Sequence, residues 1–379
     1  MQNRRANGED AAAVPRQRRV LIVAPSPLMV GGQAIHAARL IEGLRDESTV
    51  SIDLLPIDPR APKPLRWLQR IKYLRTLVTW PLYVLSLLAR IPRYDIIHVT
   101  SAANFSFLLA PTPAILIGKL FGKHVILNYH AGQAQQHLRD WRRTAIPTIR
   151  LADETIVQSQ YLVDVFTQYG LNARAIFNHV DTERFNFRER QPLKPNILSS
   201  RNLEPEYGVD VILRAFALIQ ERFPEASLTV VGDGSQRETL RTLAADLDLK
   251  RVTFTGFESP DRMPGLYDAA DICLNASTID NMPLTILESF AAGLPVVTTN
   301  AGGIPYIVTN EETGLVVEQN DPEALANSTI RLLEDAALAS RIVRQARAAC
   351  SRYTWTAVRA QWIQLYKDID ERKPTAQVN

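Results

Sequence analysis

The sequence predicts an α/β protein built from two tandem doubly wound domains that face each other across a cleft. Short runs of apolar and β-branched residues alternate with helical patterns along nearly the whole chain, which is typical of buried parallel strands. The alternation stops once, at a polar stretch over 184–196 that carries two prolines, and then starts again. The length of 379 residues also suits two domains of ordinary size. Because ligands bind at the carboxyl ends of strands in such sheets, we expect the site in the cleft.

The expected strands fall into two groups of six, on either side of the polar stretch. The first group is at 20–24, 51–54, 96–99, 125–127, 155–157 and 175–177. The second group is at 196–199, 227–231, 252–255, 272–275, 296–299 and 314–316. Helices are expected between them, for example at 34–44, 208–222 and 235–246, and a last helix at 355–372. The resulting division is a first domain at 20–183, a linker at 184–196, a second domain at 197–354 and a C-terminal helix and tail at 355–379.

The composition excludes several classes of protein. Residues 1–19 are polar and arginine-rich and are expected to form a disordered leader. Cys273 and Cys350 lack paired spacing, which argues against a disulfide framework or a zinc site and favours an intracellular protein. A net charge of +3 does not indicate a nucleic-acid partner. The longest apolar run, 77–89, is interrupted by polar residues and a proline, so no membrane span is expected. We expect a cytoplasmic protein that is at most peripheral on the inner face of the membrane.

The most informative motif places two carboxylates eight residues apart, at Asp280 and Glu288. Pro283 between them suits the first turn of a helix, because its missing N–H would have no partner there. The start of that helix would present unpaired N–H groups and a positive dipole end, which attract phosphate. Ionised carboxylates only accept hydrogen bonds, so the two acids suit sugar hydroxyls. The alternative is an aspartate that caps the helix and a solvated glutamate.

This motif, with the small residues and the Gly-Leu-Pro that follow it, resembles a family of retaining GT-B glycosyltransferases. The family is the family 4 type (glycosyl transferases group 1), which includes bacterial mannosyltransferases and sucrose synthases and has two Rossmann-like domains. The resemblance implies that Glu288 binds the ribose of a nucleotide-sugar donor and that Asp280 contacts the donor sugar. Asp280 stands where the family has glutamate, which leaves the sugar open. The intervening residues Met282, Pro283 and Leu284 are also expected to contact the donor.

A second motif, from Arg201 to Tyr207-Gly208, follows an expected strand. It resembles the family's Arg, five residues, Lys-Gly signature, whose two cations hold the donor diphosphate. Arg201 fits this role, since a guanidinium can bind two phosphate oxygens at once. Tyr207 replaces the lysine, and its hydroxyl is a candidate for a weaker contact to the diphosphate. The alternatives are an inactive protein and, for Arg201, a surface ion pair.

Glycine turns match the family in the same order along the chain. In the second half the resemblance places Gly232, Gly234 and Phe257 at the donor. In the first half, the loop at Gly31 and Gly32 is expected near the phosphates and the acceptor. A histidine at the end of a strand, His130, is implied to contact the donor sugar near the reacting centre, although a lone histidine is more often structural. Together with Arg201 and Asp280, it completes the set of residues with implied catalytic roles.

A basic and apolar segment separates two of the expected strands. No acidic residue occurs between Asp58 and Asp95, and eight lysines and arginines lie from Arg60 to Arg93 among leucines and aromatic residues. Basic residues beside an apolar, aromatic helix suit an anionic membrane surface. The alternative is a core helix with a solvated basic rim.

The resemblance implies retaining, metal-independent transfer of a sugar from a UDP- or GDP-linked donor to a sugar, lipid or polysaccharide acceptor. No Asp-x-Asp metal signature stands in a suitable loop, and no cofactor is expected. Two alternatives remain open. One is a nucleotide-sugar epimerase or hydrolase, and the other is a non-catalytic partner subunit, which the departures at Asp280 and Tyr207 favour.

Overall fold

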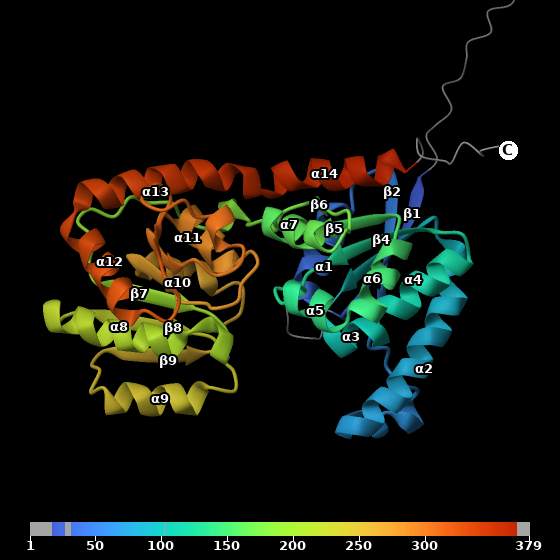
Figure 1. Ribbon diagram of the computed structural model, residues 1–379, viewed down its shortest axis with the longest axis horizontal. Helices are drawn as coiled ribbons and strands as arrows, with labels where there is room; N and C mark the ends of the chain where they lie inside the picture. Colours follow the sequence, from blue (N-terminus) through green and yellow to red (C-terminus); the bar gives the residue numbers. More distant parts are fainter. Residues whose placement is uncertain (1–16, 27–31, 102, 370–379) are drawn as a thin grey trace, which may run out of the picture.

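Two parallel β-sheets, each flanked by helices, form the framework of the protein (Figure 1). The structure is a computed structural model that describes residues 17–26, 32–101 and 103–369. The first sheet has the order β2-β1-β3-β4-β5-β6 and the second β12-β11-β10-β7-β8-β9. The first comprises β1 (Arg18–Ala24), β2 (Val50–Pro56), β3 (Ile96–Ser101), β4 (His124–Tyr129), β5 (Glu154–Val157) and β6 (Arg174–Ala175). The second comprises β7 (Asn196–Ser200), β8 (Ser227–Val231), β9 (Val252–Gly256), β10 (Ile272–Asn275), β11 (Val296–Thr299) and β12 (Leu315–Val317). The α/β fold predicted from the sequence is confirmed.

Every expected strand is present, and the differences lie at the strand ends. β8, β10 and β11 have the expected bounds. β1 begins at Arg18 rather than residue 20, because its backbone continues to pair with β2 from Arg18 opposite Val50. The expected leader therefore ends earlier than residue 19, and its residues 1–16 lie outside the described residues. β6 has only two residues, since its contact with β5 is confined to two residue pairs at the edge of the sheet.

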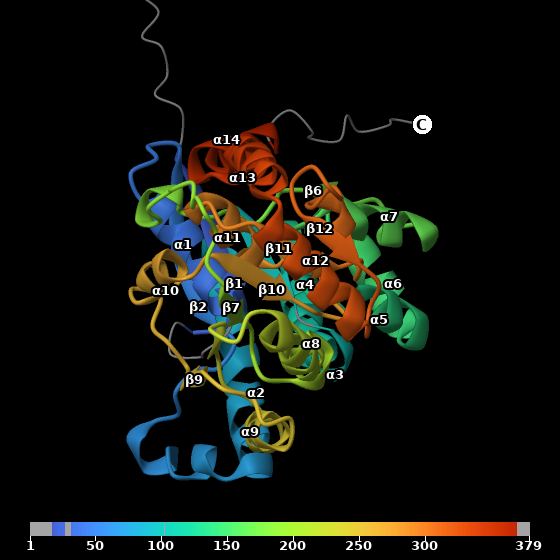
Figure 2. The ribbon, with the colours of Figure 1, turned by 90° about the vertical axis from the view of Figure 1, so that its left-hand side faces the viewer.

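Helices cover both faces of each sheet (Figures 1 and 2). The first domain contains α1 (Gly32–Gly43), α2 (Lys72–Arg90), α3 (Asn104–Leu109), α4 (Pro111–Leu120), α5 (Ala134–Asp140), α6 (Arg142–Leu151) and α7 (Gln160–Gln168). The second contains α8 (Val209–Arg222), α9 (Arg237–Asp246), α10 (Met263–Ala269), α11 (Leu284–Ala292), α12 (Pro322–Glu334) and α13 (Ala336–Cys350), and α14 (Trp355–Asp368) ends the described chain. Short 3-10 turns lie at Lys63–Leu65, Leu68–Arg70, Ile91–Arg93, Thr182–Arg184, Pro205–Tyr207, Ile304–Tyr306 and Ser351–Tyr353.

The last helix returns to the first domain. α13 and α14 run in line along one side of both domains (Figure 1), and α13 packs on α11 of the second domain. The inward face of α14, including Trp362 and Tyr366, is buried in one apolar cluster with Val20 and Ile22 of β1. The sequence predicts a helix as far as residue 372, whereas α14 ends at Asp368 and residues 370–379 lie outside the described residues. The C-terminal helix therefore ties the two domains together.

The polar stretch expected as a linker is anchored to the second domain. The Arg190 side chain is only 6% exposed, and its guanidinium donates to the backbone oxygens of Ala270, Tyr267 and Ala292. These oxygens lie at or near the ends of α10 and α11, where helix carbonyls lack partners within the helix. One arginine in the stretch thus stabilises two helix ends.

α2 extends from the body of the first domain, with the short turns before it (Figures 1 and 2). The helical segment Leu74–Arg93 is long and apolar enough to cross a membrane by length and composition, which the sequence analysis did not expect. Its polar interruptions are internally bonded, because Ser86 donates to the Leu82 oxygen and Thr79 accepts from Gln69. Only 17% of this segment is buried, so the helix is not a core helix.

Candidate active site

A cavity of about 730 Å³ lies between the two domains. Residues that follow β4, β5, β7 and β8 line it, so it opens at the carboxyl ends of strands from both sheets. Its volume falls in the range of about 300–1,000 Å³ that is usual for small-molecule sites. Of the residues expected at the site, the cavity brings together His130, Arg201, Tyr207, Gly232, Phe257, Asp280, Met282, Pro283 and Leu284.

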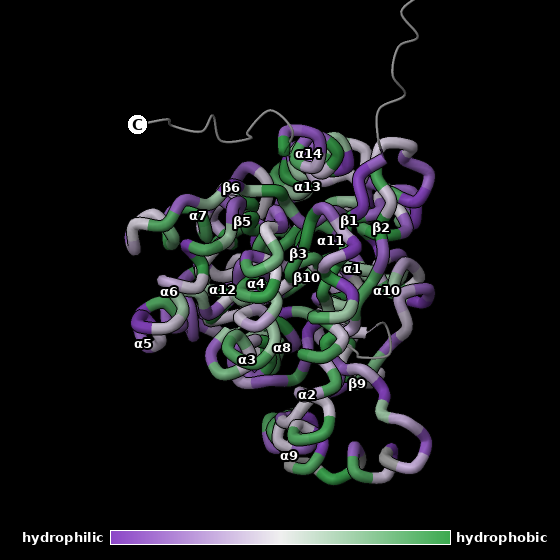
Figure 3. Tube along the Cα trace, turned by 90° about the vertical axis from the view of Figure 1, so that its right-hand side faces the viewer, coloured by the Kyte–Doolittle hydropathy of each residue, from purple (hydrophilic) through white to green (hydrophobic). Residues whose placement is uncertain are grey.

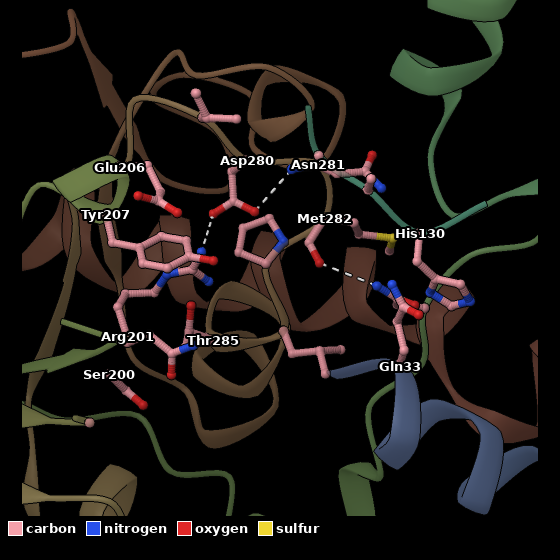
Figure 4. Close-up of a pocket in the computed structure, with 18 of the residues that line it drawn as sticks. Gln33, His130, Ser200, Arg201, Glu206, Tyr207, Asp280, Asn281, Met282 and Thr285 are labelled. Atoms are coloured by element: carbon pink, nitrogen blue, oxygen red, sulfur yellow. Dashed lines mark hydrogen bonds and ion pairs between the residues drawn. The ribbon is translucent and has the colours of Figure 1, made fainter. Parts of the chain in front are cut away.

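Arg201 is positioned by both its backbone and its side chain. It follows β7, and its backbone N–H donates to the Val231 oxygen. Its Nη2 lies 2.6 Å from Asp280 Oδ2, and the two side chains are only 12% and 10% exposed (Figure 4). The Arg201 Nε is buried and has no hydrogen-bond partner among the described residues. A buried guanidinium with an unused donor suits a further anionic acceptor in the cavity.

Gly232, directly after β8, leaves the space that the Arg201 backbone occupies. Its φ is +130°, and a Cβ at this position would collide with the Arg201 carbonyl oxygen. Any other residue would therefore displace the backbone that carries the arginine. Gly234, two residues later, packs against the Leu203 carbonyl and is not among the residues that line the cavity.

Tyr207 packs against Arg201. The guanidinium carbon lies 4.1 Å from the centre of the Tyr207 ring, and Figure 4 shows the ring against the arginine side chain. Burial raises the pKa of Tyr207, while Arg201 opposes that rise, so the hydroxyl is neutral at pH 7. The tyrosine at the family's lysine position thus lies over the cation that remains.

The loop that carries Asp280 is fixed by short backbone contacts. Asp280 Oδ1 accepts from the Asn281 backbone N–H at 2.9 Å, and the Asp280 carbonyl accepts from Gly303 N–H. Gly302 has a φ of +49°, and a Cβ there would collide with the Asp280 oxygen. The carboxylate therefore has both oxygens engaged, one by the backbone and one by Arg201.

Helix α11 starts at the cavity wall, one residue later than expected. Pro283 has a φ of −66° and a ψ of 119°, so it is the N-cap and not the first helical residue. No side chain caps this end, which leaves the N–H groups of Leu284 and Thr285 without a cap. Thr285 Oγ1 is also buried, and no described residue is its hydrogen-bond partner. These donors and the positive helix end face the cavity that holds Arg201.

Glu288 lies one turn further along α11 and is not among the lining residues. Its Oε2 accepts from the Tyr267 hydroxyl at 2.8 Å. Burial raises the pKa of Glu288, whereas the Tyr267 hydrogen bond lowers it. Thr285, which precedes it by three residues and so lies on the same helix face, lines the cavity instead.

His130 reaches the cavity from the end of β4. Its Nε2 is buried without a partner in the described part of the chain, and its ring lies 4.7 Å from that of His36. Burial, and then the charge of His98, lower the pKa of His130 to about 3, so the ring is neutral at pH 7. Phe257, which follows β9 and also lines the cavity, is 61% exposed and offers an open aromatic face. Gly32 begins α1, and Gly31 lies outside the described residues.

Several residues at the site were missed by the sequence analysis. Asn281 accepts a short hydrogen bond from the Ser159 hydroxyl of the first domain, and Asn178 donates to the Met282 oxygen at 3.4 Å. Both contacts join the domains at the cavity (Figure 4 shows Asn281 and Met282). Gln158 lines the cavity after β5, and the rule that ligands lie at strand ends was the available signal for it. Within the described ranges, no group of three acidic, histidine or cysteine residues is arranged to hold a metal ion.

Two family models match the chain in succession. The Glycosyltransferase Family 4 model matches residues 30–184, and the Glycosyl transferases group 1 model matches residues 181–349. An uncharacterized glycosyltransferase of Methanocaldococcus jannaschii is 25% identical, over 90% of this chain and 95% of that protein. A GDP-mannose-dependent α-(1-6)-phosphatidylinositol monomannoside mannosyltransferase of Mycobacterium tuberculosis is 34% identical, over 41% of this chain and 45% of that protein.

Solved structures share the fold over almost the whole chain. Sucrose-phosphate synthase from Thermosynechococcus elongatus has a TM-score of 0.77 at 22% identity, covering 94% of this chain and 100% of that one. Anabaena HepE in complex with UDP and glucose has a TM-score of 0.73 at 20% identity, covering 93% and 100%. The family expected from the sequence is confirmed: the chain belongs to the GT-B glycosyltransferases of group 1, of the family 4 type.

Proposed function

We propose that this glycosyltransferase transfers a sugar from a UDP- or GDP-linked donor to a membrane-borne acceptor, without a metal ion and with retention of the anomeric configuration. One observation carries the proposal: Arg201 and the uncapped start of α11 lie in the same interdomain cavity. The guanidinium and the helix N–H groups are suited to the donor diphosphate. HepE, crystallised with UDP and glucose, and the GDP-mannose-dependent relative support a nucleotide-sugar donor.

The proposed reaction breaks the bond between the sugar C1 and the diphosphate oxygen. Arg201 and the α11 N–H groups stabilise the negative charge that develops on the leaving phosphate. The acceptor hydroxyl attacks C1 from the same face, and its proton passes to the departing phosphate oxygen. The products are the glycoside and the nucleoside diphosphate.

Two ionisable side chains at the cavity, His130 and Asp280, are poorly suited to act as the base of an inverting reaction. An inverting enzyme needs a side chain that removes the acceptor proton. Burial lowers the pKa of His130 to about 3, so its ring is a weak base. Asp280 is engaged by Arg201 and by its own loop. The donor phosphate is therefore the proposed base.

The donor is identified by a thermal-shift screen of UDP, GDP, ADP and their common sugar derivatives. A nucleotide that binds only the folded state raises the melting temperature. We expect a rise with UDP or GDP that disappears in Arg201→Ala. Release of free sugar without an acceptor would instead support a hydrolase, a changed donor sugar would support an epimerase, and binding without turnover would support a non-catalytic subunit.

Stereochemistry and metal use are tested on the same purified protein. Proton NMR of the first product should show the anomeric configuration of the donor. Activity should persist in excess EDTA, because the proposed mechanism stabilises the leaving group with Arg201 and helix N–H groups. Inversion at C1, or loss of activity that Mg²⁺ or Mn²⁺ restores, would contradict the respective part of the proposal.

The exposed helix α2 supports the membrane-borne acceptor. Around it, hydrophobic side chains are exposed at Trp67, Ile71, Leu74, Leu77, Trp80, Leu85 and Leu88. The same segment, from Arg60 to Arg93, carries basic residues and no acidic one, which suits anionic lipid headgroups. We propose that the protein docks peripherally on the inner face of the cytoplasmic membrane through this segment. The mannosyltransferase relative, whose name gives a phosphatidylinositol-based acceptor, agrees with it.

Sedimentation with vesicles tests the docking. Each cation near an anionic surface contributes about 1 kcal/mol, so phosphatidylglycerol vesicles should bind the protein and phosphatidylcholine vesicles should not. Leu77 on α2 is 70% exposed, and Leu77→Glu should weaken binding to the phosphatidylglycerol vesicles. The control is Leu151→Glu on α6, where the exposed leucine lies outside the basic segment. Equal binding by both variants, or no binding at low salt, would contradict the docking.

A further inference from the structure

A second cavity, of about 410 Å³, lies on the first domain outside the cleft. The loop before α2, one face of α2, and α3 form its walls. The residues that line it are Ile57, Asp58, Arg60, Gln69, Arg75, Thr76, Thr79, Trp80, Tyr83, Ser106, Leu109 and Ala110. The two cavities meet opposite sides of α3, since Asn104 lines the cleft and Ser106 lines the second cavity.

The walls of this cavity are held by hydrogen bonds within the protein. Gln69 donates to the Pro59 oxygen and to Thr79 Oγ1, which fixes the loop against α2. Trp80 Nε1 donates to the Leu109 oxygen at 3.0 Å, and the Tyr83 hydroxyl donates to the Ala110 oxygen at 2.7 Å. With its polar atom engaged in this way, Trp80, which is 41% exposed, offers apolar ring surface to the cavity, whereas Tyr83 is only 1% exposed and belongs to the buried core behind it.

The cations in the cavity are unpaired. Arg60 and Arg75 have no hydrogen-bond or ion-pair partner for their guanidinium groups among the residues that the structure describes. The one acidic lining residue, Asp58, instead accepts from Ser26 N–H at 2.8 Å and from Ser26 Oγ at 2.7 Å. The cavity therefore combines two guanidinium groups that lack a partner among the described residues with the exposed apolar ring of Trp80.

We propose that this cavity binds one molecule of a lipid phosphate, with the phosphate at Arg60 and Arg75 and the start of the apolar chain along Trp80. Guanidinium groups bind phosphate oxygens through charge-assisted hydrogen bonds, and the exposed indole ring covers the chain. α4 packs against both α2 and α3, and all three helices carry hydrophobic stretches (Figure 3), so the rest of the chain can remain in the membrane beside them.

This inference deepens the proposed function by naming the acceptor class. A phosphate in the second cavity is separated from the cleft by the short helix α3, so a sugar attached to it can enter the cleft past Asn104. The acceptor would thus be a glycosylated lipid phosphate, or the lipid phosphate itself. The lipid site is distinct from the donor site and can be tested without donor.

The probe is dihexanoyl phosphatidate, used as dissolved monomers and titrated into the full chain by calorimetry. We expect saturable binding of one molecule per chain. Dihexanoyl phosphatidylcholine, with the same chains and a zwitterionic head, and inorganic phosphate, with no chain, should each bind at least about tenfold more weakly. Equal affinity for the phosphatidylcholine, or no saturable binding of phosphatidate, overturns the proposal.

Variants locate the binding. Arg60→Ala and Arg75→Ala should each raise the dissociation constant about tenfold, and Ser106→Trp should abolish binding by filling the cavity with no change in charge. Ser106 is exposed, and its hydroxyl makes no hydrogen bond to another described residue, so the substitution is compatible with folding. Arg143→Ala on α6 is the control for loss of one exposed positive charge. Wild-type affinity in both Arg60→Ala and Ser106→Trp overturns the assignment of the cavity.

Nucleotide binding separates the two proposals. All these variants should keep the thermal shift with UDP or GDP, because the donor site is formed by other residues. If phosphatidate binds as expected but no nucleotide does, the proposed transfer fails and the lipid site stands. If nucleotide binds and sugar is transferred equally well by Ser106→Trp to a lipid-linked acceptor, the lipid site fails and the transferase stands.

Discussion

The stacking of Tyr207 on Arg201 predicts that the ring of the tyrosine, and not its hydroxyl, supports donor binding. The guanidinium lies 4.1 Å from the ring centre, and the arginine side chain is only 12% exposed. A desolvated cation–π contact contributes about 1–2 kcal/mol. Tyr207→Ala should therefore raise the dissociation constant of the nucleoside diphosphate about 5- to 30-fold. Tyr207→Phe keeps the ring and should stay within about twofold of the wild type.

Calorimetry with the nucleotide found in the screen, at one fixed salt concentration, measures all three proteins. A hydrogen bond from the Tyr207 hydroxyl to a phosphate would contribute about 1.5–3 kcal/mol. In that case Tyr207→Phe would lose about tenfold or more in affinity, like Tyr207→Ala. That result would refute the stacking argument, and so would a Tyr207→Ala protein with unchanged affinity. The thermal unfolding of each variant without ligand serves as the control for folding.

Three further predictions concern single side chains. Asp280→Asn should bind the nucleoside diphosphate at least as tightly as the wild type in calorimetry, because the substitution removes a negative charge beside the diphosphate. Its transfer rate in a product assay should nevertheless fall at least about tenfold. The ribose role that the family resemblance implies for Glu288 predicts that Glu288→Ala weakens nucleotide binding about 10- to 100-fold. The wild type, but not the variant, should then prefer a ribonucleotide over its 2′-deoxy form. Equal affinity in both proteins would show that Glu288, which lies outside the cavity lining and accepts from Tyr267, is structural. His98 is buried with its Nδ1 2.7 Å from the Tyr366 hydroxyl, and burial lowers its pKa from 6.5 to about 3. As the pH falls, the unfolded chain therefore protonates His98 before the folded protein does. The stability that the neutral, buried His98 contributes is complete above pH 6.5, and about 2 kcal/mol of it is lost by pH 5. His98→Asn should therefore flatten the fall in melting temperature between about pH 7 and 5.

Much of the fold was predictable because parallel strands buried on both faces appear as continuous apolar runs. This signal located β8, β10 and β11 to the residue. The end of a strand depends instead on which backbone groups its neighbour offers, and β6 at the sheet edge shows how weakly the sequence specifies that. The docking of α14 against β1 was also not predictable, because the helical pattern does not state which domain receives the apolar face.

The candidate site was predictable where short motifs carry the chemistry. Arg201, His130 and Asp280 do meet in one cavity, although they are far apart in sequence. The contacts between them were not predictable, because they depend on side-chain packing across loops. The stacking of Tyr207 on Arg201 is the clearest case, since the sequence showed only that a lysine was missing. The exposure of α2 belongs here too, because an apolar helix has the same composition in a core and at a membrane surface.

The most direct test of the account measures how much the diphosphate itself contributes to binding, with and without Arg201. Calorimetry gives the dissociation constants of a nucleoside and of its diphosphate for the wild type and for Arg201→Ala. The account predicts that the nucleoside binds both proteins equally, while the preference for the diphosphate falls about 10- to 100-fold in the variant. The same preference for the diphosphate in both proteins would contradict the claim that Arg201 and the start of α11 jointly bind the donor diphosphate.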